Sequence, residues 1–301
     1  MASSPSSTSL QYQFRSISLP SRLHPHNTRI DVELNKLKTW QGSLVSSTVP
    51  TSGETIRTGL VGLADLYSCV EELVHSPITQ AALVQHRNGV LVEEALEGSV
   101  GFLDSCNAAR DFLLVMKQNV QDLQSVLRRK GGDSSINGNI TAYKSSQKKV
   151  KKESAKCIRA LKKMEKQNDL CSIFVVNYHL SDVIRVLREV RIVTISVLRF
   201  FFLFLSMVDS RPRPSGWSLI KMLVVTRTKG LKSLNQIGSA DAALQSLHGC
   251  IRNNDPNSDV QITRRRLEAL GDSMEGLETG LDCLYRQLVR NRVSLLNILA
   301  Q

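Results

Sequence analysis

Histidine and cysteine, the side chains that most often bind metals or act as nucleophiles, are scattered through this 301-residue sequence. No HExxH motif occurs, and the four histidines outside the N-terminal tail are isolated from one another in the sequence. We therefore expect surface or helix-capping histidines and no metal site. The six histidines are His24, His26, His75, His86, His179 and His248.

The six cysteines form no CxxC motif and no other short-range pair. They lie inside stretches with helical spacing, which is typical of small buried hydrophobic residues in a reducing compartment. The sequence therefore predicts neither a disulfide framework nor a zinc site. The cysteines are Cys69, Cys106, Cys157, Cys171, Cys250 and Cys283.

Catalytic motifs are missing as well. The sequence has no P-loop, no GxSxG and no cysteine beside a plausible base. Three glycine pairs, Gly59/Gly62, Gly98/Gly101 and Gly276/Gly280, lie within helical patterns and not after a strand, so we expect close helix approach there and no phosphate binding. The sequence thus predicts a protein that is not an enzyme and needs no cofactor.

Positive charge is concentrated in one segment. The 39 Lys and Arg residues exceed the 27 Asp and Glu residues, for a net charge of +12. Between residues 144 and 166, ten basic residues stand against only Glu153 and Glu165. The ten are Lys144, Lys148, Lys149, Lys151, Lys152, Lys156, Arg159, Lys162, Lys163 and Lys166.

Two interpretations of this basic segment remain open. Its lysines can simply solvate the outer face of a helix, or they can form a platform for an acidic protein partner or an anionic membrane surface. Nucleic acid is the weakest candidate, because no aromatic residue is interleaved to stack on a base and no recognition fold is evident.

The N-terminal tail, residues 1–27, is rich in Ser and Pro and has no acidic residue, which predicts disorder. The same composition is also found in organellar transit peptides. Within the tail, Arg15 stands three residues before Ser18 and Pro20 two residues after it. This spacing resembles the phosphoserine motif that 14-3-3 adaptors bind, so Ser18 is a candidate phosphosite.

The most apolar run of the chain extends from Val183 to Val208. Residues 192–208 have barely the length to cross a bilayer, and Arg199 would lie near the middle of such a span, where a cation is costly. Because apolar residues also follow helical spacing here, we expect a core helix over 169–208 rather than a membrane span.

The remaining pattern predicts an all-α protein, an elongated antiparallel bundle of long helices behind a disordered N-terminal tail. Apolar residues at three- and four-residue steps predict a short helix from Thr28 to about Gly42 and further helices over 54–74, 77–86, 90–130 and 134–166. A Pro-rich linker at 209–216 would separate residues 28–208 from residues 217–301, whose helices complete the same bundle.

The cleanest pattern in the chain covers residues 260–298. Twelve positions alternate three- and four-residue steps without a break, and ten of them are apolar. This coiled-coil seam can pack inside the bundle or mediate self-association, and in either case Asn291 would fix its register.

Several segments together resemble a known family. They are RSISLPSRLHP at 15–25, ELNKL at 33–37, GLADLYSCVEELV at 62–74, TQAAL at 79–83 and LYRQLVRNRVSLLNIL at 284–299. The chain is similar in these segments to a plant-specific family of helical proteins related to the BYPASS proteins. The resemblance implies an all-helical fold, no known enzymatic activity and a link to root and shoot development, and it transfers no catalytic residue.

We therefore expect a non-enzymatic helical scaffold or regulatory protein that binds a protein partner in the cytoplasm. The alternative is a peripheral or single-span membrane protein, anchored by residues 192–208 and by the basic segment 144–166, or a protein imported into an organelle.

Overall fold

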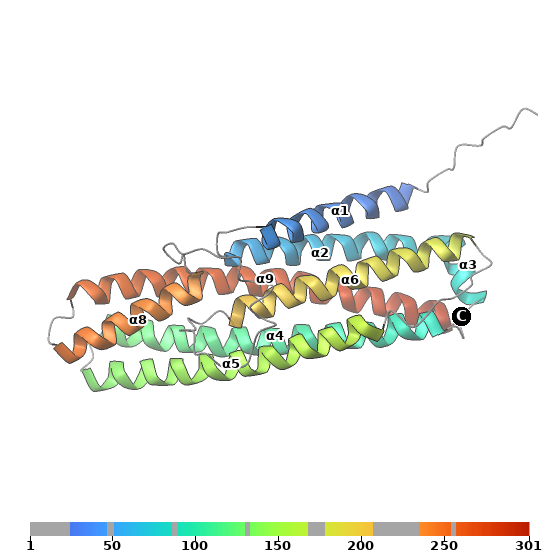
Figure 1. The fold of residues 1–301 in the computed structure, drawn as a ribbon. Coiled ribbons are helices and arrows are strands. Elements are labelled where there is room, and N and C mark those ends of the chain that lie inside the picture. The colour runs from blue at the N-terminus through green and yellow to red at the C-terminus, as the bar shows by residue number, and fades with distance from the viewer. Residues whose placement is uncertain are drawn as a thin grey trace, which may run out of the picture.

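The computed structural model describes residues 25–46, 51–85, 90–129, 133–167, 178–206, 235–253 and 257–300. These residues form helices and no strand, and the long helices lie side by side in an elongated bundle (Figure 1). The prediction of an all-α bundle is confirmed. The helices are α1 (Pro25–Ser46), α2 (Gly53–Val74), α3 (Pro77–Gln85), α4 (Val90–Arg128), α5 (Asp133–Gln167), α6 (Tyr178–Ser206), α8 (Gln236–Asn253) and α9 (Asn257–Ala300).

A serine immediately before each of α2 and α3 caps the start of that helix. The Ser52 hydroxyl accepts a hydrogen bond from the Thr55 backbone N–H at 3.1 Å, so Ser52 caps α2. Ser76 caps α3 in the same way, accepting from the Thr79 N–H at 3.3 Å, and Pro77 occupies the first helical position. The predicted Ser76–Pro77 helix start is confirmed.

Helix α9 runs along the bundle and packs most extensively against α2. Its seam is buried within the chain, with Leu267, Leu277 and Leu284 fully covered. The backbones approach closely where a Cβ atom on Gly280 would lie only 3.2 Å from Cβ of Leu60. The predicted seam therefore packs inside the bundle. Self-association through 260–298 stays a prediction that would have to use the opposite side of α9.

Helix α6 carries the apolar run, and one side of the helix is buried in the bundle as predicted, over the residues described. Phe201, Phe202 and Leu198 are fully covered. Arg199, whose charge disfavours a membrane span, donates a hydrogen bond to Glu165 of α5 at 3.0 Å. No helix in the described ranges is long and apolar enough to cross a membrane.

Helix α1 extends beyond the predicted end near Gly42, to Ser46. A Cβ atom at Gly42 would meet no neighbour within 4 Å, so this glycine is an ordinary exposed position and not a helix stop. The helix also begins at Pro25, three residues before the predicted start. Leu44 continues the spacing of Leu37 by seven residues, which explains why the helix persists.

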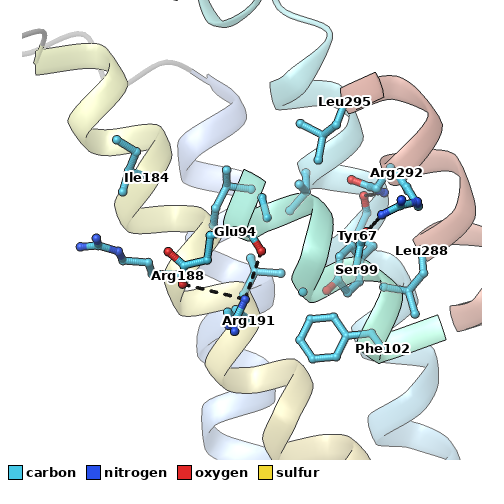
Figure 2. A pocket seen from close by; sticks show the side chains of 16 residues that line it. Tyr67, Glu94, Ser99, Phe102, Ile184, Arg188, Arg191, Leu288, Arg292 and Leu295 are labelled. Carbon is cyan, nitrogen blue, oxygen red and sulfur yellow. Dashed lines mark hydrogen bonds and ion pairs between the residues drawn. The ribbon is translucent and has the colours of Figure 1, made fainter. Parts of the chain in front are cut away.

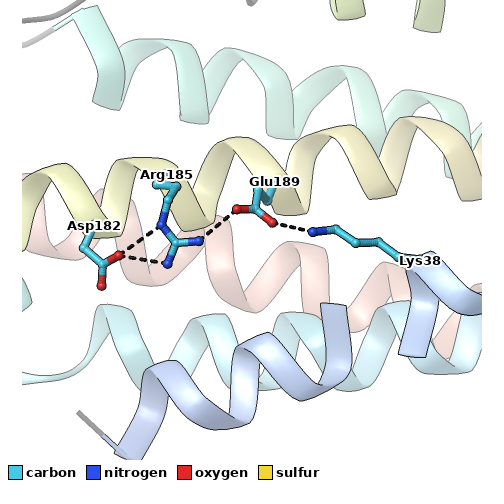
Figure 3. Close-up of polar contacts among 4 residues, drawn as sticks. All are labelled: Lys38, Asp182, Arg185 and Glu189. Atoms are coloured by element: carbon cyan, nitrogen blue, oxygen red, sulfur yellow. Dashed lines mark hydrogen bonds and ion pairs between the residues drawn. The ribbon is translucent and has the colours of Figure 1, made fainter. Parts of the chain in front are cut away.

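Side-chain contacts hold α1 on the bundle. Lys38 donates to Glu189 of α6 at 2.7 Å, and Glu189 accepts a second bond from Arg185, which also binds Asp182 (Figure 3). Trp40 contacts Phe200 of α6 edge to face, with ring centroids 5.8 Å apart. Polar and aromatic contacts thus join α1 to α6.

Some predicted elements fall outside the described residues. These are the N-terminal tail up to residue 24, the first part of the predicted core helix at 169–177, the linker at 209–216 and the first part of the predicted C-terminal helices, residues 217–234. Helix α8 begins after Asn235, whose Oδ1 accepts from the Gly238 N–H at 2.8 Å. It packs mainly on α9.

Candidate functional site

The ten basic residues predicted as a binding face lie on α5, at one edge of the bundle (Figure 1). Nine of the ten side chains are exposed, and Lys144 is half-buried. We call these ten residues the basic face. Their exposure agrees with both interpretations given above, solvation and binding.

The basic face is narrow and long. At about 100° per residue, its ten members fall within about 160° of the helix circumference, and Lys144 and Lys166 lie about 33 Å apart along the axis. The two glutamates of the segment fall outside this arc. Glu165 binds Arg199 of α6, and Glu153 binds Lys156 at 2.8 Å. Between residues 144 and 166, the arc contains no carboxylate of α5.

The opposite side of α5 anchors the helix to its neighbours. Ile140, Val150 and Leu161 are buried there, against a bundle in which α5 contacts α4, α6 and α8. Tyr143 is also covered, and burial, with a smaller effect of the Asp241 carboxylate on α8, raises the pKa of its phenol well above the ordinary value. The basic face is therefore displayed by a helix whose other side is fixed.

The histidines with described side chains make structural contacts. His75 Nδ1 lies 2.8 Å from the Glu71 carbonyl, His179 Nε2 lies 3.1 Å from Thr79 Oγ1, and His248 Nδ1 lies 2.8 Å from Asn137 Oδ1. Within the described part of the chain, no group of three or more His, Cys, Asp or Glu side chains is placed to hold a metal ion.

The candidate phosphosite Ser18 lies outside the described residues.

Sequence reasoning missed a cavity between α2, α4, α6 and α9 (Figure 2). Its volume is about 90 Å³, several times the roughly 10–15 Å³ that one water molecule needs. We call it the interhelical cavity. Its lining is mostly apolar and includes four charged side chains, Glu94, Arg188, Arg191 and Arg292.

Glycine makes room for one of these arginines. Arg191 Nη1 lies 3.3 Å from the Glu94 carbonyl and 3.9 Å from its carboxylate, and Nη2 donates to the Met164 carbonyl at 3.1 Å. A Cβ atom on Gly98 would lie 2.4 Å from Nη1, so a larger residue at this position would force the end of the Arg191 side chain to shift. The Gly98/Gly101 pair was the one sequence signal for this region, but its partner residues could not be identified from the sequence.

Comparison with known proteins is consistent with the resemblance seen in the sequence. Neither the curated proteins nor the solved structures give a match. The family described as Protein BPS1 matches residues 59–298, which include all of α3, α4, α5, α6 and α8 and most of α2 and α9. Since this match covers most of the chain, the protein belongs to the BPS1 family.

Proposed function

We propose that this protein is a non-enzymatic scaffold or regulatory protein that binds an acidic protein surface through the basic face. Its resemblance to the BYPASS-related proteins links it to plant root and shoot development, and we place it in the cytoplasm. The observation that carries the proposal is the arc of ten basic side chains, nine of them exposed, on one side of α5.

A rigid arc of like charges favours binding over simple solvation for a physical reason. Like charges on one helix face repel one another and lower the stability of the helix, so an acidic partner would relieve this cost as well as gain Coulomb energy. The two glutamates that could have interrupted the arc lie on its flanks and bind Lys156 and Arg199. The face therefore suits an elongated acidic partner, such as an acidic helix.

The composition of α5 favours a protein partner over a lipid surface. Helices that enter a membrane interface bury large apolar side chains beside their basic residues. Among the α5 side chains that the structure describes, no large hydrophobic residue is exposed. Binding to a membrane surface is one of the outcomes that the test below distinguishes.

The test compares two variants that lose the same charge. The first replaces Lys148, Lys149, Lys151 and Lys152 with Gln. The control replaces Arg265, Arg266, Arg286 and Arg290, which are exposed on α9, with Gln. Binding of a polyglutamate peptide and of phosphatidylserine vesicles is measured at increasing salt, and circular dichroism checks helicity.

We expect the wild type and the α9 variant to bind polyglutamate, the α5 variant to lose this binding, and salt to weaken it, because exposed charges are screened within about 8 Å at physiological ionic strength. Equal loss in both variants would mean that only net charge matters and would overturn the proposal. Binding to vesicles without binding to polyglutamate would favour the membrane alternative instead.

A further inference from the structure

We propose that the interhelical cavity binds a small amphipathic carboxylate, with the apolar part of the ligand inside the cavity and its carboxylate among the arginines. This site is separate from the basic face, and the proposal does not depend on the function proposed above.

The apolar part of such a ligand has a matching surface. Four helices contribute apolar side chains to the lining, so a ligand would be surrounded on several sides. Burial of apolar surface supplies most of the binding energy at sites of this kind, while a few polar groups fix orientation. The large apolar side chains of the lining are Val70, Phe102, Ile184, Leu187, Leu288 and Leu295.

The charge of the lining selects an anion. Arg188, Arg191 and Arg292 stand against the single carboxylate of Glu94, so the lining carries a formal charge of +2. The Arg191 side chain is only 11% exposed, so its charge is less screened by water than a surface charge and attracts a ligand carboxylate more strongly. A cationic or neutral ligand with the same apolar part would lack this attraction.

Arg191 is incompletely neutralised in the structure. Its side chain is only 11% exposed, its two terminal nitrogens bind backbone carbonyls, and a carboxylate oxygen of Glu94 lies 3.9 Å from Nη1. Buried charges are normally paired at closer range. A ligand carboxylate would supply a closer partner.

Arg292 approaches the same helix from α9. Its Nη1 donates to the Leu96 carbonyl at 2.5 Å and to Ser99 Oγ at 2.6 Å, and both acceptors are neutral. Figure 2 shows Arg292 beside Ser99. Arg191 and Arg292 therefore both bind the first turns of α4. Arg191 of α6 and Arg292 of α9, which are far apart in the sequence, both line the cavity.

Two further polar atoms of the lining residues lack partners among the described residues. They are Nε of Arg191 and Oδ1 of Asn291. The Asn291 amide is oriented by its Nδ2, which donates to the Tyr67 and Gln287 carbonyls at 2.9 Å. Buried polar atoms are normally hydrogen-bonded, and a ligand would give these two atoms a partner once their side chains rotate toward it. Both are shielded in this conformation, so side-chain rotation would have to accompany ligand entry.

The experiment uses the full-length protein and a series of probes. Hexanoate, hexanol and hexylamine have six carbons each and differ in the polar group, and butanoate and octanoate vary the length. Saturation-transfer NMR titrations give the affinity for each probe. We expect hexanoate to bind about tenfold or more tightly than hexanol, since hydrogen bonds to charged groups are the stronger ones, and hexylamine to bind weakest.

Two variants test the location. Ala95→Leu fills the cavity from α4, and its control, Ala108→Leu, adds the same volume at a half-buried position of α4 outside the lining. Arg292→Gln removes a cation from the cavity, and Arg290→Gln removes an exposed one from the same helix. Ala95→Leu should abolish hexanoate binding and Arg292→Gln should weaken it about tenfold, whereas the two controls should bind as the wild type does.

Three results would overturn the proposal. The first is no binding by any carboxylate of the series, and the second is equal affinity for hexanoate and hexanol. The third is hexanoate binding that survives both Ala95→Leu and Arg292→Gln. Thermal unfolding of each variant shows that a loss of binding is not a loss of folding.

Discussion

The indole ring of Trp40 lies directly over Gly59. A Cβ atom at Gly59 would lie 2.3 Å from Cζ2 of Trp40 and less than 3.0 Å from two further ring atoms. The ring is held in place because Nε1 donates to the Thr55 carbonyl at 2.9 Å. Gly59 is therefore the residue on α2 that lets α1 dock.

Gly59→Ala should destabilise the protein although alanine favours helix. The rigid indole cannot move away without losing its hydrogen bond and its contact with Phe200, and overpacking of this kind costs about 1–3 kcal/mol. Gly138→Ala on α5 is the control, because a Cβ atom there meets nothing within 4 Å. It should stabilise by about 0.5–1 kcal/mol. Urea unfolding measures both, and equal effects would contradict the contact between Trp40 and Gly59.

Phe202→Ala should cost about 3–5 kcal/mol, because it empties a fully covered aromatic position. Phe202 contacts Phe201 and Phe112 edge to face, with ring centroids 5.6 and 6.1 Å away. Ile192→Ala is the control on the same helix, since Ile192 is 49% exposed, and it should cost far less. Comparable losses in the free energy of unfolding would show that the apolar run is not buried on the side described.

Much of this fold follows from spacing along the sequence. The seam of α9 was predictable because one residue in every three or four must face the core, and the same rule marks α2, α4 and α5. The glycine pairs predicted close approach of helices. A Cβ atom added at any of the six glycines would lie within 3.3 Å of a neighbouring side chain. The six are Gly59, Gly62, Gly98, Gly101, Gly276 and Gly280.

The sequence could not predict which residues meet across the bundle. Gly98 and Arg191 are far apart in the chain, and their contact depends on how α4 and α6 are rotated about their axes. The interhelical cavity depends on the same rotations of four helices. The basic face was predictable because charge and period are local properties, but neither property identifies what it binds.

Cys106 and Cys283 should react with alkylating reagents at very different rates. Cys106 is fully buried, and burial raises the pKa of its thiol to about 12, so the reactive thiolate is scarce and shielded. Cys283 is exposed on α9. Peptide mapping after treatment of the folded protein with iodoacetamide should show alkylation of Cys283 and not of Cys106, which should react only in denaturant. Labelling of both at one rate would indicate frequent opening between α4 and its neighbours.

The ion-pair chain that joins α1 to α6 should make stability depend on acid pH. The hydrogen bond from Lys38 is the largest of the effects that lower the pKa of Glu189 below its ordinary value of 4.5, and the bond from Arg185 adds to it. A carboxylate whose pKa is lowered by folding stabilises the protein above its unfolded pKa. That stabilisation is lost as the pH falls through the folded pKa, when the carboxylate is protonated.

Glu189→Gln removes this titration, so its free energy of unfolding should fall less than that of the wild type as the pH drops below 4.5. Lys38→Gln should give an intermediate slope, because the bond from Arg185 to Glu189 remains at 2.8 Å. Urea unfolding at a series of acid pH values gives the three slopes. If Lys38→Gln and the wild type had the same slope, Lys38 would not be the main partner of Glu189, and the attachment of α1 to α6 would rest on Trp40 instead.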